Sequence, residues 1–238
     1  MDNVLFLITA RSGSKGVKDK NIKEIFDIPL LAIRGLSALK LTSNENIWLS
    51  TDSKKYAEIG EKYNLSVPFL RPKELANDKC SSNDVVLHAM RFAKKLGKKF
   101  DFIALLEPTS PFVYYEDLKM AIEQLEKDTY AAAIIATKIV ETSTVFVQKN
   151  TSYLSQLATN IDNLTSHRRQ DVELEITPSG GFYISRWNDF LEKPTFYKQN
   201  TLSYILPDES CLEIDSEIQL EWAYFLAEKK IAQKDKIL

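Results

Sequence analysis

Cysteine is scarce in this sequence of 238 residues, and the sequence also lacks long apolar stretches and a signal peptide. The two cysteines, Cys80 and Cys211, are too few to hold a fold together by disulfides or to bind zinc by themselves. No apolar stretch reaches eighteen residues, and the N-terminus lacks the basic, apolar and small-residue order of a signal peptide. We therefore expect a cytoplasmic protein with reduced thiols and no membrane partner.

An excess of positive charge is also missing. The chain has 31 Lys and Arg against 33 Asp and Glu, a formal net charge of -2. A protein whose main ligand is nucleic acid needs an excess of cations to neutralise phosphates, so we expect no nucleic-acid partner. The motifs GxxxxGK[ST] and GxGxxG are absent as well, which argues against an ATPase P-loop and a dinucleotide-binding turn.

Short apolar runs alternate along the chain with segments that have apolar residues at helical spacing. Unbroken apolar runs are typical of buried parallel strands, and their alternation with helices predicts an α/β fold with a doubly wound, mostly parallel sheet. The expected strands are 4–8, 46–50, 67–70, 102–106, 131–136, 144–148, 179–185 and 202–207, and the expected helices are 30–41, 54–63, 85–96, 115–127 and 216–229. In the last helix we expect Ile218, Trp222, Phe225 and Leu226 to face inward.

The alternation breaks down between residues 137 and 177, where a polar run shows no clear helix. A segment of that length inserted between two sheet strands is more typical of an excursion that packs on another subunit than of a loose loop. The sequence therefore predicts one α/β domain, built from residues 1–136 and 178–238, with residues 137–177 as an inserted segment that packs on another subunit; the resemblance given below implies that this segment is a dimerisation and sugar-contacting segment.

The segment after the first expected strand, residues 9–21 and here called the first loop, is rich in glycine and cations. Glycine lets a backbone approach a ligand closely, and open α/β sheets bind ligands at the carboxyl ends of their strands. The loop suits a polyphosphate, although a solvated basic turn is the alternative when the loop is considered alone. The residues concerned are Gly13, Gly16, Arg11, Lys15, Lys18 and Lys20.

Two carboxylates near the end of the chain, Glu213 and Asp215, alternate around Ile214. If they end a strand, both face one side and can hold a hard cation such as Mg²⁺. The alternative is that Asp215 caps the final helix, as Asp52 or Ser53 is expected to cap the helix that begins near residue 54.

Several segments, taken in order, resemble the CMP-sialic acid synthetases, or acylneuraminate cytidylyltransferases. The resemblance is dense over the first half of the chain and resumes at three later segments. The matching segments are TARSGSKG with the following KN, LSTDS with YAEI, PFLRPKELAND, DVVLHA and LEPTSP, and later RQ (Arg169, Gln170), SGGFYI and EIDSE.

The resemblance implies a Rossmann-like nucleotidyltransferase that uses Mg²⁺ to transfer CMP from CTP onto the anomeric hydroxyl of an acidic nine-carbon 2-keto-3-deoxy sugar. Pyrophosphate is released, and the inserted segment forms a homodimer. It assigns the triphosphate to Arg11, Ser14, Lys15 and Lys20, the cytidine to Asn21, Arg71 and Ser82, and the metal to Glu213 and Asp215. Arg169 and Gln170 would face the sugar, and we add Glu107, Thr109, Ser110, Ser179 and Gly180 from their expected place at the sheet edge. Catalysis would rest on charge neutralisation by Arg11, Lys15 and Lys20, with Asp215 or a metal-bound hydroxide as the candidate acceptor of the sugar's proton.

Three positions depart from the family's usual residues. Glu107 stands where Gln is usual, Phe112 and Val113 where an Arg is usual, and Glu213 where Asp is usual. A further negative charge beside an acidic sugar is unfavourable unless that sugar carries a cation or strong donors, so we expect a legionaminate-like or amino-bearing relative of N-acetylneuraminate. The alternatives are an octulosonate cytidylyltransferase, which acts on an eight-carbon acid, and a non-catalytic nucleotide-binding module.

Overall fold

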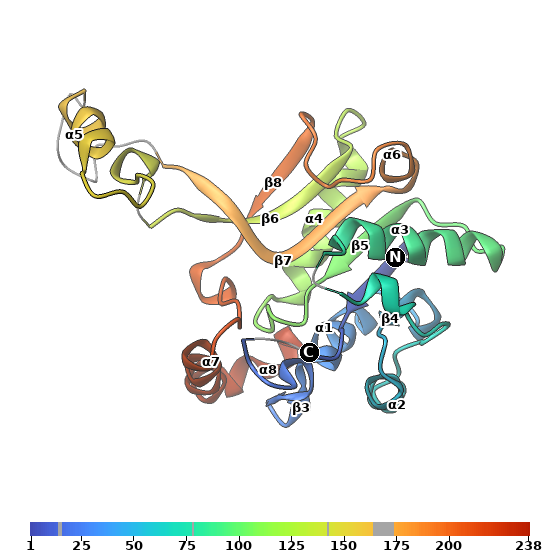
Figure 1. Cartoon of the computed structure of the whole chain (residues 1–238). Helices are drawn as coiled ribbons and strands as arrows, with labels where there is room; N and C mark the ends of the chain where they lie inside the picture. Colours follow the sequence, from blue (N-terminus) through green and yellow to red (C-terminus); the bar gives the residue numbers. More distant parts are fainter. Residues whose placement is uncertain (14–15, 78, 142, 164–173) are drawn as a thin grey trace.

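The computed structural model describes residues 1–13, 16–77, 79–141, 143–163 and 174–238 and is built around one six-stranded sheet (Figure 1). The strand order is β4-β1-β5-β7-β6-β8, with β7 antiparallel to both neighbours and all other pairs parallel. The predicted doubly wound, mostly parallel sheet is confirmed. The strands are β1 Val4–Thr9, β4 Ile47–Ser50, β5 Phe102–Leu106, β6 Ala133–Ile139, β7 Ile176–Arg186 and β8 Thr201–Ile205, and a small hairpin pairs β2 Glu24–Ile25 with β3 Ile28–Pro29.

Helices cover both faces of the sheet because alternate side chains of its strands point to opposite sides. Phe6 and Ile8 pack in a core with α1, α2 and α4, whereas Leu5 and Leu7 pack in a second core with α3 and α6. The helices are α1 Leu30–Leu39, α2 Lys54–Lys62, α3 Ser82–Lys95, α4 Tyr115–Lys127, α5 Ser155–Asp162, α6 Trp187–Glu192, α7 Glu217–Lys229 and α8 Lys234–Ile237.

Helix α7 packs through a different face from the one predicted. Ile218, Trp222 and Phe225 are 56%, 57% and 59% exposed, so the prediction that they face inward is wrong. Leu226 is partly buried, as expected. Buried instead is a narrower face that packs in a third core with the β2–β3 hairpin, because two alanines let the helix approach the hairpin closely. That face consists of Leu220, Ala223 and Ala227.

Two expected strands are also wrong. Residues 67–70 form no continuous strand and pair through isolated bridges from Ser66 and Leu70, because Pro68 has no N–H to donate to a ladder. Residues 144–148 begin as the short 3₁₀ helix Thr144–Phe146, since the Ser143 hydroxyl accepts the Val145 N–H (3.4 Å) and stabilises a turn.

An arm extends away from the main body and carries α5 (Figure 1). Strands β6 and β7 run beyond their neighbours into this arm, and the Val140 N–H donates to the Glu175 carbonyl (2.8 Å) at its base. The expectation of no helix in residues 137–177 is wrong, since α5 lies there, while its role as an inserted dimerisation segment stays a prediction. None of the helices within the described residues has the length and apolar character that a bilayer crossing requires.

Candidate active site

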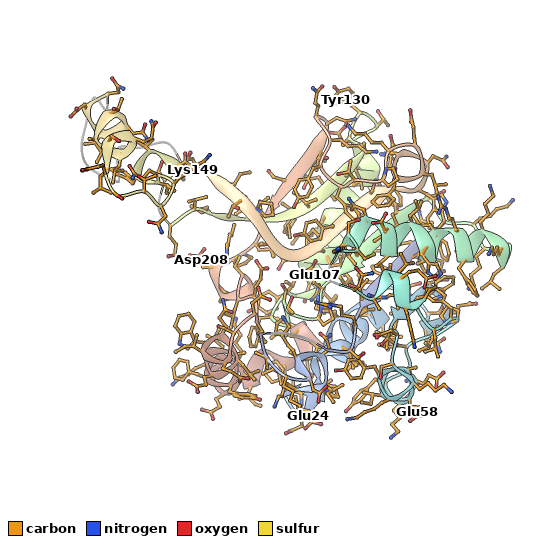
Figure 2. The ribbon with its side chains drawn as sticks, viewed as in Figure 1. Glu24, Glu58, Glu107, Tyr130, Lys149 and Asp208 are labelled. Atoms are coloured by element: carbon orange, nitrogen blue, oxygen red, sulfur yellow. The ribbon has the colours of Figure 1, made fainter. Side chains whose placement is uncertain are left out.

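Three parallel strands bring their carboxyl ends to one edge of the sheet. Thr9 of β1 pairs with Ser50 of β4, and Ile8 pairs with Leu106 at the end of β5. The first loop, the turn before α2 and the turn after β5 therefore meet at this edge. Figure 2 shows Glu107, the first residue after β5, in the middle of the molecule and far from Lys149 on the arm.

A cavity of about 410 Å³ opens at this edge. It gathers residues that lie far apart in the sequence, from Thr9 to Asp215, as expected for a ligand site at the carboxyl ends of parallel strands. The predicted site residues that line it are Arg11, Lys20, Asn21, Arg71, Ser82, Glu107, Thr109 and Asp215.

The first loop contacts the segment that carries Asp215. Lys20 Nζ donates to Asp215 Oδ1 at 2.9 Å, and the Lys20 side chain is 14% exposed against 69% for Asp215. Gly16 lies so close to Asp215 that a Cβ atom at residue 16 would stand 2.1 Å from the Asp215 carbonyl oxygen. The backbone approach that glycine was expected to allow is thus made to another part of the chain.

Asp215 is held from the other side by the turn after β5. The Ile214 N–H donates to the Thr109 carbonyl at 2.9 Å, and the Ile214 side chain is fully buried. Residues 213–215 are irregular, so the condition under which both carboxylates would face one side of a strand is not met. Asp215 is not the cap of α7 either, because Ser216 caps this helix in a capping box with Gln219. The Asp215 carboxylate is therefore available to the cavity.

Arg71 supplies a buried cation to the cavity wall. Its Nε donates to Ser50 Oγ at 3.0 Å, and its Nη2 donates to the Ser50 carbonyl. Burial lowers the pKa of Arg71 to about 10, with the charge of Asp52 acting in the opposite direction. Arg71 is thus charged at neutral pH and cannot leave the cavity wall without breaking these bonds.

Three carboxylates lie close enough to affect one another: Glu107 and Asp215 line the cavity, and Glu213 lies behind them. Burial raises the pKa of Glu107 to about 7, and repulsion from Glu213 and Asp215 adds to the effect while Lys20 opposes it. Burial likewise raises the pKa of Glu213, opposed by Lys138 and reinforced by Asp215. This concentration of negative charge beside a basic loop is the arrangement that a cation and a polyphosphate would together neutralise.

The sequence profile of the family described as Cytidylyltransferase matches residues 5–231. The chain belongs to the cytidylyltransferase family. Together with the relatives described next, this match confirms the predicted membership of the CMP-sialic acid synthetase family and the prediction of a nucleotidyltransferase enzyme.

Among its relatives is the N-acylneuraminate cytidylyltransferase of Escherichia coli O18:K1:H7, 32% identical over 97% of this chain and 54% of that protein. This chain thus spans about half the length of that relative. The pseudaminic acid cytidylyltransferase of Campylobacter jejuni serotype O:2 is 27% identical over 93% of this chain and 95% of its own. The CMP-N,N'-diacetyllegionaminic acid synthase of Legionella pneumophila is 29% identical over 92% and 93%.

The fold of this cytidylyltransferase is similar to that of a solved CMP:2-keto-3-deoxy-manno-octonic acid synthetase complexed with CTP. The TM-score is 0.67 at 15% identity, over 95% of this chain and 99% of that one. At this identity the similarity concerns the fold alone, and it agrees with the predicted nucleotidyltransferase architecture.

Glu213 in this cytidylyltransferase packs against a glycine rather than lining the cavity directly. Gly180 has a φ of +68°, and a Cβ there would lie 2.6 Å from Glu213 Oε2 and 3.1 Å from Ser110 Oγ. The hydroxyls of Ser110 and Ser179 are buried, with no hydrogen-bond partner among the described residues. These four predicted residues therefore form a group beside the cavity. Glu213 affects the cavity through its charge, which acts on the cavity-lining Glu107.

The residues present fit a magnesium ion that takes only one or two of its ligands from the protein and the rest from phosphate oxygens and water. Among the described parts of the chain, no three Asp, Glu, His or Cys side chains are arranged to hold a metal by themselves. Mg²⁺ is usually bound by one or two carboxylates together with phosphate oxygens and water, and Glu213 and Asp215 can supply such a pair. Burial is the main cause of the raised pKa of Glu107 and Glu213, and a divalent cation would relieve the repulsion between carboxylates that adds to it.

Four predicted site residues, Ser14, Lys15, Arg169 and Gln170, lie outside the described residues. Conversely, the cavity is also lined by residues that the sequence analysis did not assign to the site, among them Asn77 and Cys80. Asn77 lies in the segment PFLRPKELAND, which carries part of the family resemblance, and Cys80 lies just after it, but neither residue type indicates a particular ligand.

Proposed function

We propose that this protein transfers CMP from CTP to the anomeric hydroxyl of a nine-carbon 2-keto-3-deoxy sugar acid and releases pyrophosphate. The observation that supports this most directly is the convergence of Arg11, Lys20, Arg71 and Asp215 in one cavity at the carboxyl edge of the sheet. Three relatives that cover almost the whole chain are named for sialic, pseudaminic and legionaminic acid substrates, and all three are nine-carbon acids.

Arg11, Ser14, Lys15 and Lys20 would hold the triphosphate in this proposal. Transfer of a nucleotidyl group needs positioning and charge neutralisation more than a covalent nucleophile, and cations around the phosphates provide both. Lys20 is suited to this role because it is largely buried at the cavity and already bonds an anionic oxygen, that of Asp215.

The base would be held by Asn21, Arg71 and Ser82. All three line the cavity, and Asn21 is oriented by donating its Nδ2 to the Arg11 carbonyl (3.1 Å). Ser82 is the first residue of α3, whose cap is Ser81, so its hydroxyl is not used for capping.

Glu213 and Asp215 would hold Mg²⁺ together with phosphate oxygens of CTP. The ion would neutralise charge on the α-phosphate and the departing pyrophosphate. In the chemical step the sugar's anomeric oxygen forms a bond to the α-phosphorus, the α–β phosphoanhydride bond breaks, and pyrophosphate leaves with the electron pair. The hydroxyl proton passes to a carboxylate, for which we propose Asp215, with Lys20 holding its Oδ1.

The sugar would lie beside Glu107, Thr109 and Ser110 and toward Ser179 and Gly180, with Arg169 and Gln170 contributing from the inserted segment. Glu107 favours a sugar whose substituents donate hydrogen bonds or carry a positive charge, because its carboxylate is flanked by the negative charges of Glu213 and Asp215. We therefore retain the proposal of a legionaminate-like or amino-bearing acid in preference to ordinary N-acetylneuraminate.

Pyrophosphate release from CTP is the direct test. The protein is incubated with CTP, Mg²⁺ and a panel that contains N-acetylneuraminate, legionaminate and pseudaminate derivatives and an eight-carbon octulosonate. We expect turnover with a nine-carbon acid, with a higher kcat/KM for a legionaminate-like compound. A clear preference for N-acetylneuraminate would refute the substrate proposal, a preference for the octulosonate would favour the alternative enzyme, and CTP binding without pyrophosphate would identify a non-catalytic binding module.

We further propose that residues 137–177 mediate a homodimer and that the protein acts in the cytoplasm. The arm exposes large apolar side chains, with Tyr153 80%, Leu154 64% and Leu174 80% exposed, and such surface is stabilised by contact with another subunit. Sedimentation analysis of the wild type and of a Tyr153→Ser/Leu154→Ser variant would test the dimer, and a monomeric wild type would contradict it. Cell fractionation would test the location.

A further inference from the structure

Asp52 binds the first loop from a neighbouring strand. Its Oδ1 accepts the Ser12 N–H at 2.8 Å, and its Oδ2 accepts the Ser12 hydroxyl at 2.7 Å. Asp52 directly follows Thr51, which lies beyond the end of β4, whereas Ser12 lies three residues beyond the end of β1. Both oxygens of one carboxylate are thus engaged with a single residue of the loop that carries Arg11.

This carboxylate is not required by the helix that follows it. Ser53, one of the two residues expected to cap α2, is the cap, and its hydroxyl accepts the Tyr56 N–H at 3.3 Å. Asp52 therefore does not cap α2, although an acidic residue at the start of a helix often does. Its two hydrogen bonds serve the first loop.

The same helix start also contacts the far end of the loop. The hydroxyl of Tyr56, a side chain only 2% exposed, donates to Asp19 Oδ1 at 3.3 Å. Asp19 adopts a left-handed backbone conformation, with a φ of 53°, directly before Lys20. Asp52, in the turn before α2, and Tyr56, in the first turn of α2, thus bind the loop just after Arg11 and just before Lys20.

Asp52 carries a charge that does not favour a polyanionic ligand. A carboxylate near a triphosphate site weakens binding by repulsion unless it makes another contribution. Asp52 makes two such contributions, because it fixes Ser12 and its charge partly offsets the cost of burying Arg71. Asp52 therefore lies near Arg71 and next to the loop residue that follows Arg11 because it positions the first loop, not because it contacts the ligand.

We propose that Asp52, assisted by Tyr56, is a positioning residue that holds the first loop in the geometry needed for nucleotide transfer. The proposal rests on the proposed function and deepens it, since it states how Arg11 and Lys20 are kept at the cavity. Asp52 acts through Ser12 and touches no substrate atom in this proposal.

The experiment compares Asp52→Ala, Asp52→Asn, Ser12→Ala and the Asp52→Ala/Ser12→Ala double variant, with Ser53→Ala as the matched control from the same turn. Steady-state pyrophosphate release gives kcat and KM for CTP, and thermal unfolding reports stability. Hydrogen exchange of the peptide that contains Ser12 reports loop order without requiring any activity.

Asp52→Ala should lower kcat/KM by about 100-fold, the scale expected when reacting groups are displaced by about 1 Å. Ser12→Ala should have a smaller effect, because its backbone N–H still binds Asp52, and the double variant should be no worse than Asp52→Ala within about 2-fold. Asp52→Asn should lie between wild type and Asp52→Ala, since its amide oxygen can accept the Ser12 N–H. Ser53→Ala should lower the unfolding temperature while kcat/KM stays within about 2-fold.

Exchange at the Ser12 peptide should be faster in Asp52→Ala and unchanged in Ser53→Ala. Unchanged exchange in Asp52→Ala would overturn the proposal, as would faster exchange with unaltered kinetics or additive effects of the two substitutions. If the wild type releases no pyrophosphate with any acid, the proposed function fails, and CTP affinity then replaces kcat/KM as the second readout of the loop. An Asp52→Ala variant with faster exchange and wild-type CTP affinity would overturn the positioning role in that case.

Discussion

Gly16 is the residue whose replacement tests the arrangement of the site most sharply. A Cβ atom added there would lie 2.1 Å from the carbonyl oxygen of Asp215, whereas ordinary van der Waals contact begins at about 3.4 Å. The obstructing atom belongs to the backbone and cannot rotate away. The φ of Gly16 is not in the left-handed region, so Gly16→Ala introduces a clash without a conformational penalty of its own.

The clash sets the size of the expected effect. The first loop and the Asp215 segment must separate by more than 1 Å to restore normal contact. The Asp215 segment is tied to Thr109 by the Ile214 N–H bond, so we expect the loop to give way and the Lys20–Asp215 bond to lengthen. Displacement of reacting groups by about 1 Å costs about 100-fold in rate, which corresponds to about 2.7 kcal/mol of transition-state stabilisation.

Pyrophosphate release at saturating sugar acid, with CTP and Mg²⁺ varied, measures this effect. Gly13→Ala is the matched control in the same loop, because Gly13 has a φ of +77° but nothing lies within 4 Å of an added Cβ. It should lose about 1 kcal/mol of stability through backbone strain and retain most of its activity. Gly16→Ala should lose most of its activity, together with about 1–3 kcal/mol of stability from the clash.

Activity of Gly16→Ala within about 3-fold of the wild type would refute this reasoning. Such a result would mean that contact between the first loop and the Asp215 segment is not needed for catalysis. Equal losses in Gly16→Ala and Gly13→Ala would assign the effect to loop strain in general. Either outcome would remove the principal geometric support for the proposed site.

Three further predictions concern the carboxylates and the helix that follows them. The pKa of Glu107 is raised from 4.5 to about 7, so its contribution to stability is present below pH 4.5 and is lost as the pH rises through 7. The loss is at most about 3 kcal/mol, measured as the fall in unfolding free energy between pH 5 and pH 8 in urea without Mg²⁺. Glu107→Gln should abolish this fall. Gly180→Ala, strained by its φ of +68° and pressing on Glu213, should raise the Mg²⁺ concentration needed for half-maximal pyrophosphate release several-fold. Ser216→Ala breaks the capping box with Gln219 and should lower the unfolding free energy by about 1 kcal/mol in urea titration.

The main sheet could be predicted because its strands have local signals. Val4–Thr9 and Phe102–Leu106 are unbroken apolar runs followed by turn residues, and both are fully paired central strands. Residues 67–70 have a similar composition, yet Pro68 leaves them with isolated bridges at the sheet margin. Strand propensity indicates a suitable backbone, but the ladder requires a donor at each paired position.

Helix α7 shows what periodicity cannot decide. Its sequence has two apolar faces, one with Ile218, Trp222 and Phe225 and one with Leu220, Ala223 and Ala227. The larger side chains were expected to be buried, but the face with the two alanines is the one that packs. The choice depends on the shape of the neighbouring hairpin, which the helix sequence does not contain.

Residue types at the site could be predicted, whereas their contacts could not. Lys20 and Asp215 were each assigned to a ligand, but the bond between them joins positions 195 residues apart. It forms because the Ile214 N–H anchors one segment to the turn after β5 while Gly16 lets the other approach. Asp52 was considered for capping, and its actual partner, Ser12, lies in the same long-range assembly.

The carboxylate group gives this long-range assembly its chemical meaning. Glu107 follows β5, whereas Glu213 and Asp215 precede α7, so no local pattern indicates that their charges interact. Burial and the charges of Glu213 and Asp215 raise the pKa of Glu107, and burial and the charge of Asp215 raise the pKa of Glu213, so this part of the site holds a repulsion that a cation can relieve. A cation would neutralise these carboxylates, and a polyanion would neutralise the first loop. The site should therefore bind the two together, as a magnesium–nucleotide complex, more tightly than either alone.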